Sequence, residues 1–201
     1  MIKICLFDMG GVTDIFDNAA MQRKMLAYLG DASHRLLSDF GEEARMLENK
    51  LCRGLVSDGK FWEAFSRLSG LPVPEDVHLY ARFFNPRPNP GTIRIIEDLK
   101  AKGMRVVGAT NVEPLHRAWH EAHHEYDVFD ALYASDLMHL AKPDPAFFEA
   151  IATSEHLDFE EMVHVDDRLE NVESARSLGI HALLFTTPEK LRSDFEALGL
   201  L

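Results

Sequence analysis

The sequence predicts an α/β protein: a doubly wound, parallel five-stranded sheet with a helical cap inserted after the first strand. Three observations predict this fold: five short apolar runs, helical patterns between the later runs, and a long helical stretch between the first two. Short runs that are apolar throughout are typical of strands covered on both faces, as parallel strands are. The predicted strands are residues 2–7, 104–109, 131–134, 162–165 and 181–185.

Helix signals separate the later strands. Apolar side chains recur at helical spacing in residues 169–178. The pairs Asp144-Pro145 and Thr187-Pro188 each combine an N-cap residue with a proline at the first helical position. Alternation of strand and helix implies right-handed crossovers, and therefore an open sheet with helices on both faces.

The stretch between the first two strands predicts several helices and no strand. Apolar stripes with helical spacing end at Gly30 and Gly70, and the proline-rich residues 85–90 are typical of a stiff linker. Because ligands of open α/β sheets bind at the carboxyl ends of the strands, a cap there could select substrates. We assign residues 1–15 and 86–201 to an α/β core domain, and residues 16–85 to the helical cap.

Composition narrows the classes of partner and the cellular compartment that we expect for this chain. Hydrophobic residues make up 46% of the 201 residues and charged ones 27%, which is a soluble globular profile. The 33 acidic and 21 basic residues leave a net charge of −12, which argues against nucleic acid and anionic membranes as partners. No apolar run is long enough to cross a bilayer, and two cysteines make no disulfide framework, so we expect a cytoplasmic protein.

Polar residues follow four of the predicted strands at their carboxyl ends. Converging carboxylates repel one another unless a cation neutralises them, and carboxylate oxygens suit Mg²⁺. A phosphate would then fit between Mg²⁺, the Lys142 ammonium and the Thr110 hydroxyl, with an aspartate as nucleophile. The polar residues of this predicted site are Asp8, Thr110, Asn111, Lys142, Asp166 and Asp167.

The same segments resemble the motifs of the haloacid dehalogenase-like superfamily of phosphohydrolases. The resemblance runs the length of the chain, and is greatest to the subgroup of glucose-1-phosphatase and the N-terminal phosphatase domain of epoxide hydrolase. The four motifs are Phe7-Asp8-x-Gly10-Gly11-Val12, Thr110-Asn111, Lys142-Pro143-Asp144-Pro145 and Asp166-Asp167-x-x-x-Asn171-Val172.

The resemblance implies a magnesium-dependent phosphatase that hydrolyses a small phosphorylated metabolite, similar to a sugar phosphate. It implies that Asp8 is the nucleophile that becomes an aspartyl-phosphate, and that Thr110, the backbone around Asn111, and Lys142 bind the phosphoryl oxygens. It further implies that Mg²⁺ is held by the Asp8 carboxylate, the Gly10 carbonyl and Asp167, with Asp166 beside it.

One position departs from the family pattern. Related phosphatases usually carry a second aspartate where this chain has Gly10, and use it as general acid and base. Asp14 or Asp17 could supply the proton, although each could simply cap the first cap helix; otherwise only good leaving groups would depart quickly.

Two other functions stay open. The first is a metal-independent haloacid dehalogenase, against which the paired Asp166-Asp167 argues. The second is a catalytically weak phosphate- or partner-binding protein, which Gly10 makes plausible. The sequence favours neither a particular phosphate ester nor an oligomeric state.

Two further clusters have competing interpretations. His116, His120 and His124 have a four-residue spacing that could bind zinc or nickel, but such a spacing is more often a solvated helix face. The aromatic residues of the insert are more often cap core than a substrate box. They are Phe61, Trp62, Phe83 and Phe84.

Overall fold

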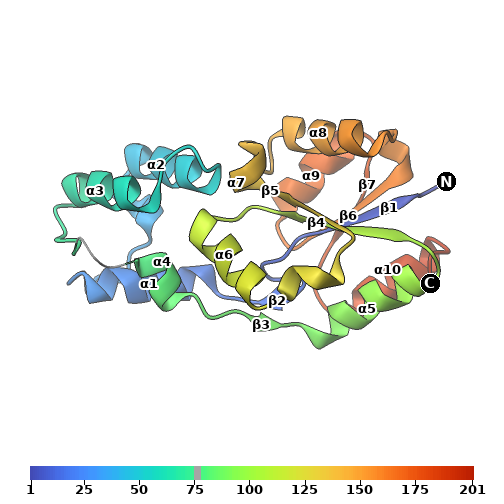
Figure 1. Cartoon of the computed structure of the whole chain (residues 1–201), viewed down its shortest axis with the longest axis horizontal. Coiled ribbons are helices and arrows are strands. Elements are labelled where there is room, and N and C mark those ends of the chain that lie inside the picture. The colour runs from blue at the N-terminus through green and yellow to red at the C-terminus, as the bar shows by residue number, and fades with distance from the viewer. Residues whose placement is uncertain (75–77) are drawn as a thin grey trace.

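In the computed structural model, which describes residues 1–74 and 78–201, five parallel strands form one sheet in the order β5-β4-β1-β6-β7 (Figure 1). Every pair of neighbours in it is parallel, so all five strands bring their carboxyl ends to one edge. The predicted α/β fold with a five-stranded parallel sheet is confirmed. The strands are β1 (Ile4–Phe7), β4 (Arg105–Thr110), β5 (Ala131–Ala134), β6 (Met162–Asp166) and β7 (His181–Leu184).

Helices cover both faces of this sheet because its strands are apolar on both sides. In β1, Cys5 and Phe7 pack into the layer of α5 and α10, whereas Ile4 and Leu6 pack into the layer of α8 and α9. Figure 1 shows these two helical layers on opposite sides of the sheet. The four helices are α5 (Pro90–Ala101), α10 (Pro188–Ala197), α8 (Pro145–Glu155) and α9 (Leu169–Ser177).

Two of these helices begin where the sequence predicts. The Asp144 carboxylate accepts a hydrogen bond from the Ala146 amide (3.1 Å), and the Thr187 hydroxyl accepts one from the Lys190 amide (3.2 Å). These bonds satisfy amides that a helix start leaves without partners.

In the described part of the cap, four helices pack around an apolar core of their own, separate from the two clusters on the sheet. Fully buried Met25, Phe61 and Tyr80 belong to this core, and Trp62 is buried with them, as its stripe predicts. Leu115 of α6 (Pro114–Ala122) also packs against it, so α6 lies between the cap and the sheet (Figure 1). The division into residues 1–15 and 86–201 against 16–85 stays a prediction. The cap helices are α1 (Asn18–Tyr28), α2 (Glu42–Cys52), α3 (Asp58–Ser69) and α4 (Leu79–Phe83).

A second, two-stranded sheet corrects two expectations: that the stretch between the first two predicted strands holds no strand, and that residues 85–90 are only a stiff linker. Strand β2 (Asp14–Ile15) pairs antiparallel with β3 (Arg87–Pro88). Two residues per strand are too few for an alternating pattern, and proline ordinarily argues against a strand because it donates no ladder hydrogen bond. The Asn89 amide donates to the Thr13 carbonyl (2.9 Å), so both connections to the cap run side by side.

The remaining elements are short. None of the helices in residues 1–74 and 78–201 has the length and apolarity that a membrane crossing needs. The remaining short elements are α7 (Ser135–Met138) and the 3₁₀ helices η1 (Leu37–Phe40), η2 (Glu125–Val128) and η3 (Phe159–Glu161).

Candidate active site

A cavity of about 380 Å³ lies at the carboxyl edge of the sheet, between the core and the cap. Residues of the first two predicted motifs line its floor, together with Lys142 and Asp167. Asp166 does not line it and lies fully buried behind. The predicted residues on the floor are Asp8, Gly10, Thr110, Asn111, Lys142 and Asp167.

Asp8 follows β1 directly and is anchored by its amide, which donates to the Val165 carbonyl (2.9 Å). Its carboxylate forms an ion pair with the Lys142 ammonium (2.9 Å). Burial raises the pKa of Asp8 to about 7, with the charge of Lys142 opposing this rise and the charge of Asp166 adding to it. The buried carboxylate therefore depends on nearby positive charge to stay ionised at neutral pH.

Lys142 is buried between two aspartates, 2.9 Å from Asp8 and 2.6 Å from Asp166. Burial lowers the pKa of Lys142, but the charges of these aspartates outweigh it, so the pKa lies above its ordinary value. Asn111 fixes the backbone at this point: its side chain donates to the Lys142 carbonyl (2.7 Å) and accepts from the Lys142 amide (2.9 Å). The loops that follow β4 and β5 are thereby tied together, with the ammonium directed at Asp8.

Asp166 and Asp167 are neighbours with different surroundings. Both oxygens of Asp166 are engaged: it accepts from Lys142, from the Arg168 amide (2.9 Å) and from the Asn171 amide group (3.0 and 3.1 Å). Although burial raises the pKa of Asp166, the charge of Lys142 holds it well below its usual range. Asp166 thus positions Lys142, whereas exposed Asp167 faces the cavity.

Gly11 makes room for Asp167. Its φ of +83° is a conformation that glycine adopts without penalty, and a Cβ there would overlap the Asp167 carboxylate. Asp8, Asp166 and Asp167 each offer an oxygen, all within 4.8 Å of one another. Three carboxylates against the one Lys142 ammonium form a donor set and a charge that fit a divalent cation.

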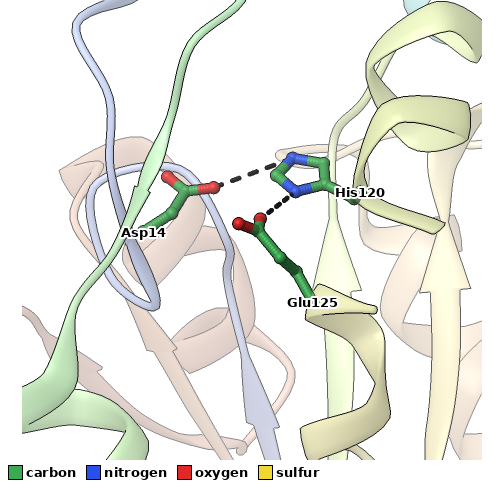
Figure 2. Close-up of side chains that lie close together, drawn as sticks. All are labelled: Asp14, His120 and Glu125. Carbon is green, nitrogen blue, oxygen red and sulfur yellow. Dashed lines mark hydrogen bonds and ion pairs between the residues drawn. The ribbon is translucent and has the colours of Figure 1, made fainter. Parts of the chain in front are cut away.

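A second cluster joins buried Asp14 of β2, buried His120 of α6 and half-buried Glu125 of η2 (Figure 2). Nδ1 of His120 lies 2.6 Å from Oε2 of Glu125, and its Nε2 lies 3.7 Å from Oδ2 of Asp14. Burial and the charge of Asp8 raise the pKa of Asp14 to about 7. Asp14 and His120 line the same cavity as Asp8. Glu125 could not be predicted from the sequence, because no motif or spacing connects it with Asp14.

The three histidines do not form the solvated helix face that their spacing favours. In the part of the chain that the structure describes, they do not assemble as a metal site either. His116 and His120 are buried, and His116 stacks on the ring of Phe84 with centroids 3.7 Å apart. Phe84 lines the cavity as well as the cap core. His124 lies beyond the end of α6 and is exposed.

Asp17 caps the first cap helix, which is one of the two roles that the sequence leaves open for it. Its carboxylate accepts from the Ala20 amide (2.8 Å) and caps α1, although it also lies at the cavity. Asp14 caps no helix, since it lies within β2.

Known proteins resemble this chain over most of its length. A family model described as haloacid dehalogenase-like hydrolase matches residues 2–179. A sesquiterpene phosphatase of Aspergillus oryzae is 28% identical over 186 residues, which are 92% of this chain and 90% of that protein.

Solved structures share the fold. A haloacid dehalogenase-like hydrolase from Porphyromonas gingivalis superposes with a TM-score of 0.79 at 21% identity, covering 98% of both chains. A family enzyme from Bacteroides thetaiotaomicron, in complex with magnesium and inorganic phosphate, superposes with a TM-score of 0.66 at 21% identity, covering 92% of this chain and 95% of that one.

Proposed function

The chain belongs to the haloacid dehalogenase-like hydrolases, and from that premise we propose that it is a magnesium-dependent phosphatase of small phosphate monoesters. One observation carries the proposal: the Asp8 carboxylate lies on the cavity floor, 2.9 Å from a buried ammonium, with Asp167 at the same edge. This combination supplies a nucleophile, a phosphate-binding cation and carboxylates for a metal in one place.

The reaction has two halves. In the first, a carboxylate oxygen of Asp8 attacks phosphorus and the bond from phosphorus to the leaving oxygen breaks. In the second, water attacks the phosphorus of the aspartyl-phosphate, and Asp8 is released as carboxylate. Lys142, the Thr110 hydroxyl and the backbone at Asn111 would hold the phosphoryl oxygens and offset their charge throughout.

The metal would be held by the Asp8 carboxylate, the Gly10 carbonyl and Asp167, with Asp166 adjacent. When bound, Mg²⁺ neutralises charge on the transferring phosphoryl group. The carboxylate donor set supports this choice of ion, as does the magnesium in the Bacteroides thetaiotaomicron structure. The full engagement of Asp166 in hydrogen bonds favours Asp167 as the direct ligand of the two.

The cavity walls suit two classes of leaving group. Asp17, Asn18 and Glu113 line part of the cavity and could bind hydroxyl groups, which supports a sugar-phosphate-like substrate. Phe16 and Phe84 line another part. Together with the likeness to a sesquiterpene phosphatase, this apolar wall favours a terpenoid monophosphate as a second candidate.

A panel of sugar, terpenoid and aryl phosphates, each assayed with Mg²⁺ and with EDTA, tests the proposal. We expect at least one class to be hydrolysed with Mg²⁺, silenced by EDTA and restored by added Mg²⁺, whereas Ca²⁺ should restore little because its coordination shell is larger and looser. Turnover that survives EDTA would contradict the metal requirement. Metal-independent release of halide from haloalkanoates would favour the dehalogenase instead, and phosphate binding with no turnover would favour a binding protein.

A further inference from the structure

The proposed reaction requires a proton to move twice, and position 10 cannot move it. A leaving alkoxide must be protonated in the first half, and the attacking water must lose a proton in the second. Gly10 has no side chain, and a Cβ built there would meet no atom within 4 Å. Another group at the same cavity must therefore exchange the proton, or esters of basic alcohols react slowly.

His120 is held in place for such an exchange. Figure 2 shows its imidazole between two carboxylates, with one ring nitrogen toward each. Glu125 accepts from Nδ1 at 2.6 Å, which fixes the ring orientation and leaves Nε2 as the exchanging nitrogen. The arrangement follows the logic of catalytic triads, in which a buried carboxylate orients the histidine that moves the proton.

On the side of the ring that faces Asp14, the polar atoms are not hydrogen-bonded to each other. Nε2 of His120 lies 3.7 Å from Oδ2 of Asp14, which is longer than a hydrogen bond. Oδ1 of Asp14 is buried and has no hydrogen-bond partner among residues 1–74 and 78–201. Since buried polar atoms are normally paired, this unpaired oxygen beside Nε2 at the cavity indicates that a further polar group binds between them and the substrate.

We propose that His120, oriented by Glu125 and flanked by Asp14, is the general acid and base of this enzyme in place of the carboxyl group that Gly10 lacks. This inference rests on the proposed phosphatase function. Burial lowers the pKa of His120, and the charge of Glu125 opposes that lowering and stabilises the imidazolium. Nε2 of this imidazolium gives its proton to the leaving oxygen as the bond to phosphorus breaks. The neutral ring then takes a proton from water as the water oxygen bonds to phosphorus, and Asp8 is released. The products are the alcohol and inorganic phosphate, and His120 is again imidazolium.

The neighbouring His116 suits the task less well. His116 also lines the cavity, and Glu113 contacts its Nδ1 (2.8 Å), but His116 is stacked on Phe84 of the cap. His120 instead faces Asp14, whose amide donates to the Met9 carbonyl (3.0 Å) in the loop of the nucleophile.

Each of the three side chains offers an atom within 4.8 Å of the others, so a cation could also approach them. Asp14 and Glu125 lie at opposite ring nitrogens of His120, however, so the ring nitrogen that faces one carboxylate points away from the other. The geometry suits a proton, which one nitrogen can carry while the other stays bonded to Glu125.

Pre-steady-state kinetics of His120→Gln in saturating Mg²⁺ test this proposal, because the glutamine amide can still bond to Glu125 but cannot exchange a proton. An alkyl phosphate should lose about 10²-fold or more in kcat, since general acid–base catalysis is worth about 10²–10⁴-fold. An aryl phosphate needs little protonation to leave, so it should give a burst of one equivalent of aryl alcohol, followed by slow hydrolysis of the aspartyl-phosphate.

Three further variants separate catalysis from structure. Gly10→Asp has space for its Cβ and should restore alkyl phosphate turnover to the His120→Gln background, which a merely structural defect would not allow. His123→Gln, an exposed position on the same stretch of chain, is the matched control and should behave as wild type. Glu125→Gln should lower kcat while leaving KM unchanged, as expected of a positioning residue.

Wild-type alkyl turnover in His120→Gln, or a lack of the aryl burst, would overturn the proposal. Should His120→Gln fail to fold, the burst is measured on Glu125→Gln, where its absence would overturn the proposal equally. Asp8→Asn is assayed beside these variants. If it is silent while His120→Gln behaves as wild type, only this inference fails; if it turns over normally, the phosphatase proposal itself fails.

Discussion

Replacing Asp166 by alanine should destabilise the fold far more than replacing its neighbour Asp167. Asp166 is fully buried and accepts hydrogen bonds from Lys142 and Asn171. Removing one partner of a buried ion pair costs about 3–5 kcal/mol. Lys142 would keep its contact with Asp8, so we expect the lower end, about 3 kcal/mol. For a chain of this length that corresponds to a fall in Tm of roughly 6–12 °C.

Asp167→Ala is the matched control, because Asp167 is exposed and its loss should change the free energy of unfolding by about 0.5 kcal/mol or less. Thermal unfolding in EDTA measures both variants without metal. The order should reverse in an Mg²⁺ titration of activity, where Asp167→Ala raises the half-saturating concentration much more. A wild-type Tm for Asp166→Ala, together with the larger Mg²⁺ requirement, would refute this assignment of the two aspartates.

Two other substitutions follow from local geometry. Burial and the charge of Glu113 raise the pKa of Glu48 from 4.5 to about 7, so the folded chain holds a proton that the unfolded chain releases, and stability falls as pH rises through that window. Glu48→Gln keeps an acceptor for Gln22 and should stabilise the fold by about 2 kcal/mol at pH 8 but not at pH 4; parallel Tm curves would contradict this. Gly11→Ala places a Cβ against Asp167 and should raise the Mg²⁺ requirement, whereas Gly30→Ala has a similar positive φ and open space, so equal Mg²⁺ requirements would exclude the contact as the cause.

The order of polar residues along the chain was enough to predict the cavity floor. Asp8 follows β1, Thr110 ends β4, and Lys142 lies in the segment after β5. Since parallel strands end at one edge, their meeting needs no knowledge of packing. The difference between Asp166 and Asp167 could not be predicted this way, because it depends on which partners surround each carboxylate in three dimensions.

The sequence also could not predict that Asp14, His120 and Glu125 lie close together. It depends on the pairing of β2 with β3, which brings Asp14 beside α6, and strands of two residues leave no periodic signal. Polarity suggests that His116 and His120 are solvated, yet both are buried. Packing between elements that are far apart in the sequence determines whether these two side chains are buried. Their spacing within one helix carries no information about that packing.

The turnover of Asp8→Asn, compared with wild type on one substrate in saturating Mg²⁺, tests the central claim most directly. The amide is nearly isosteric with the carboxylate, so the fold and the cavity should persist while the nucleophile is lost. We predict a loss of more than ~10³-fold in kcat, a barrier increase of about 4 kcal/mol. Activity above a tenth of the wild-type value would contradict Asp8 as the nucleophile.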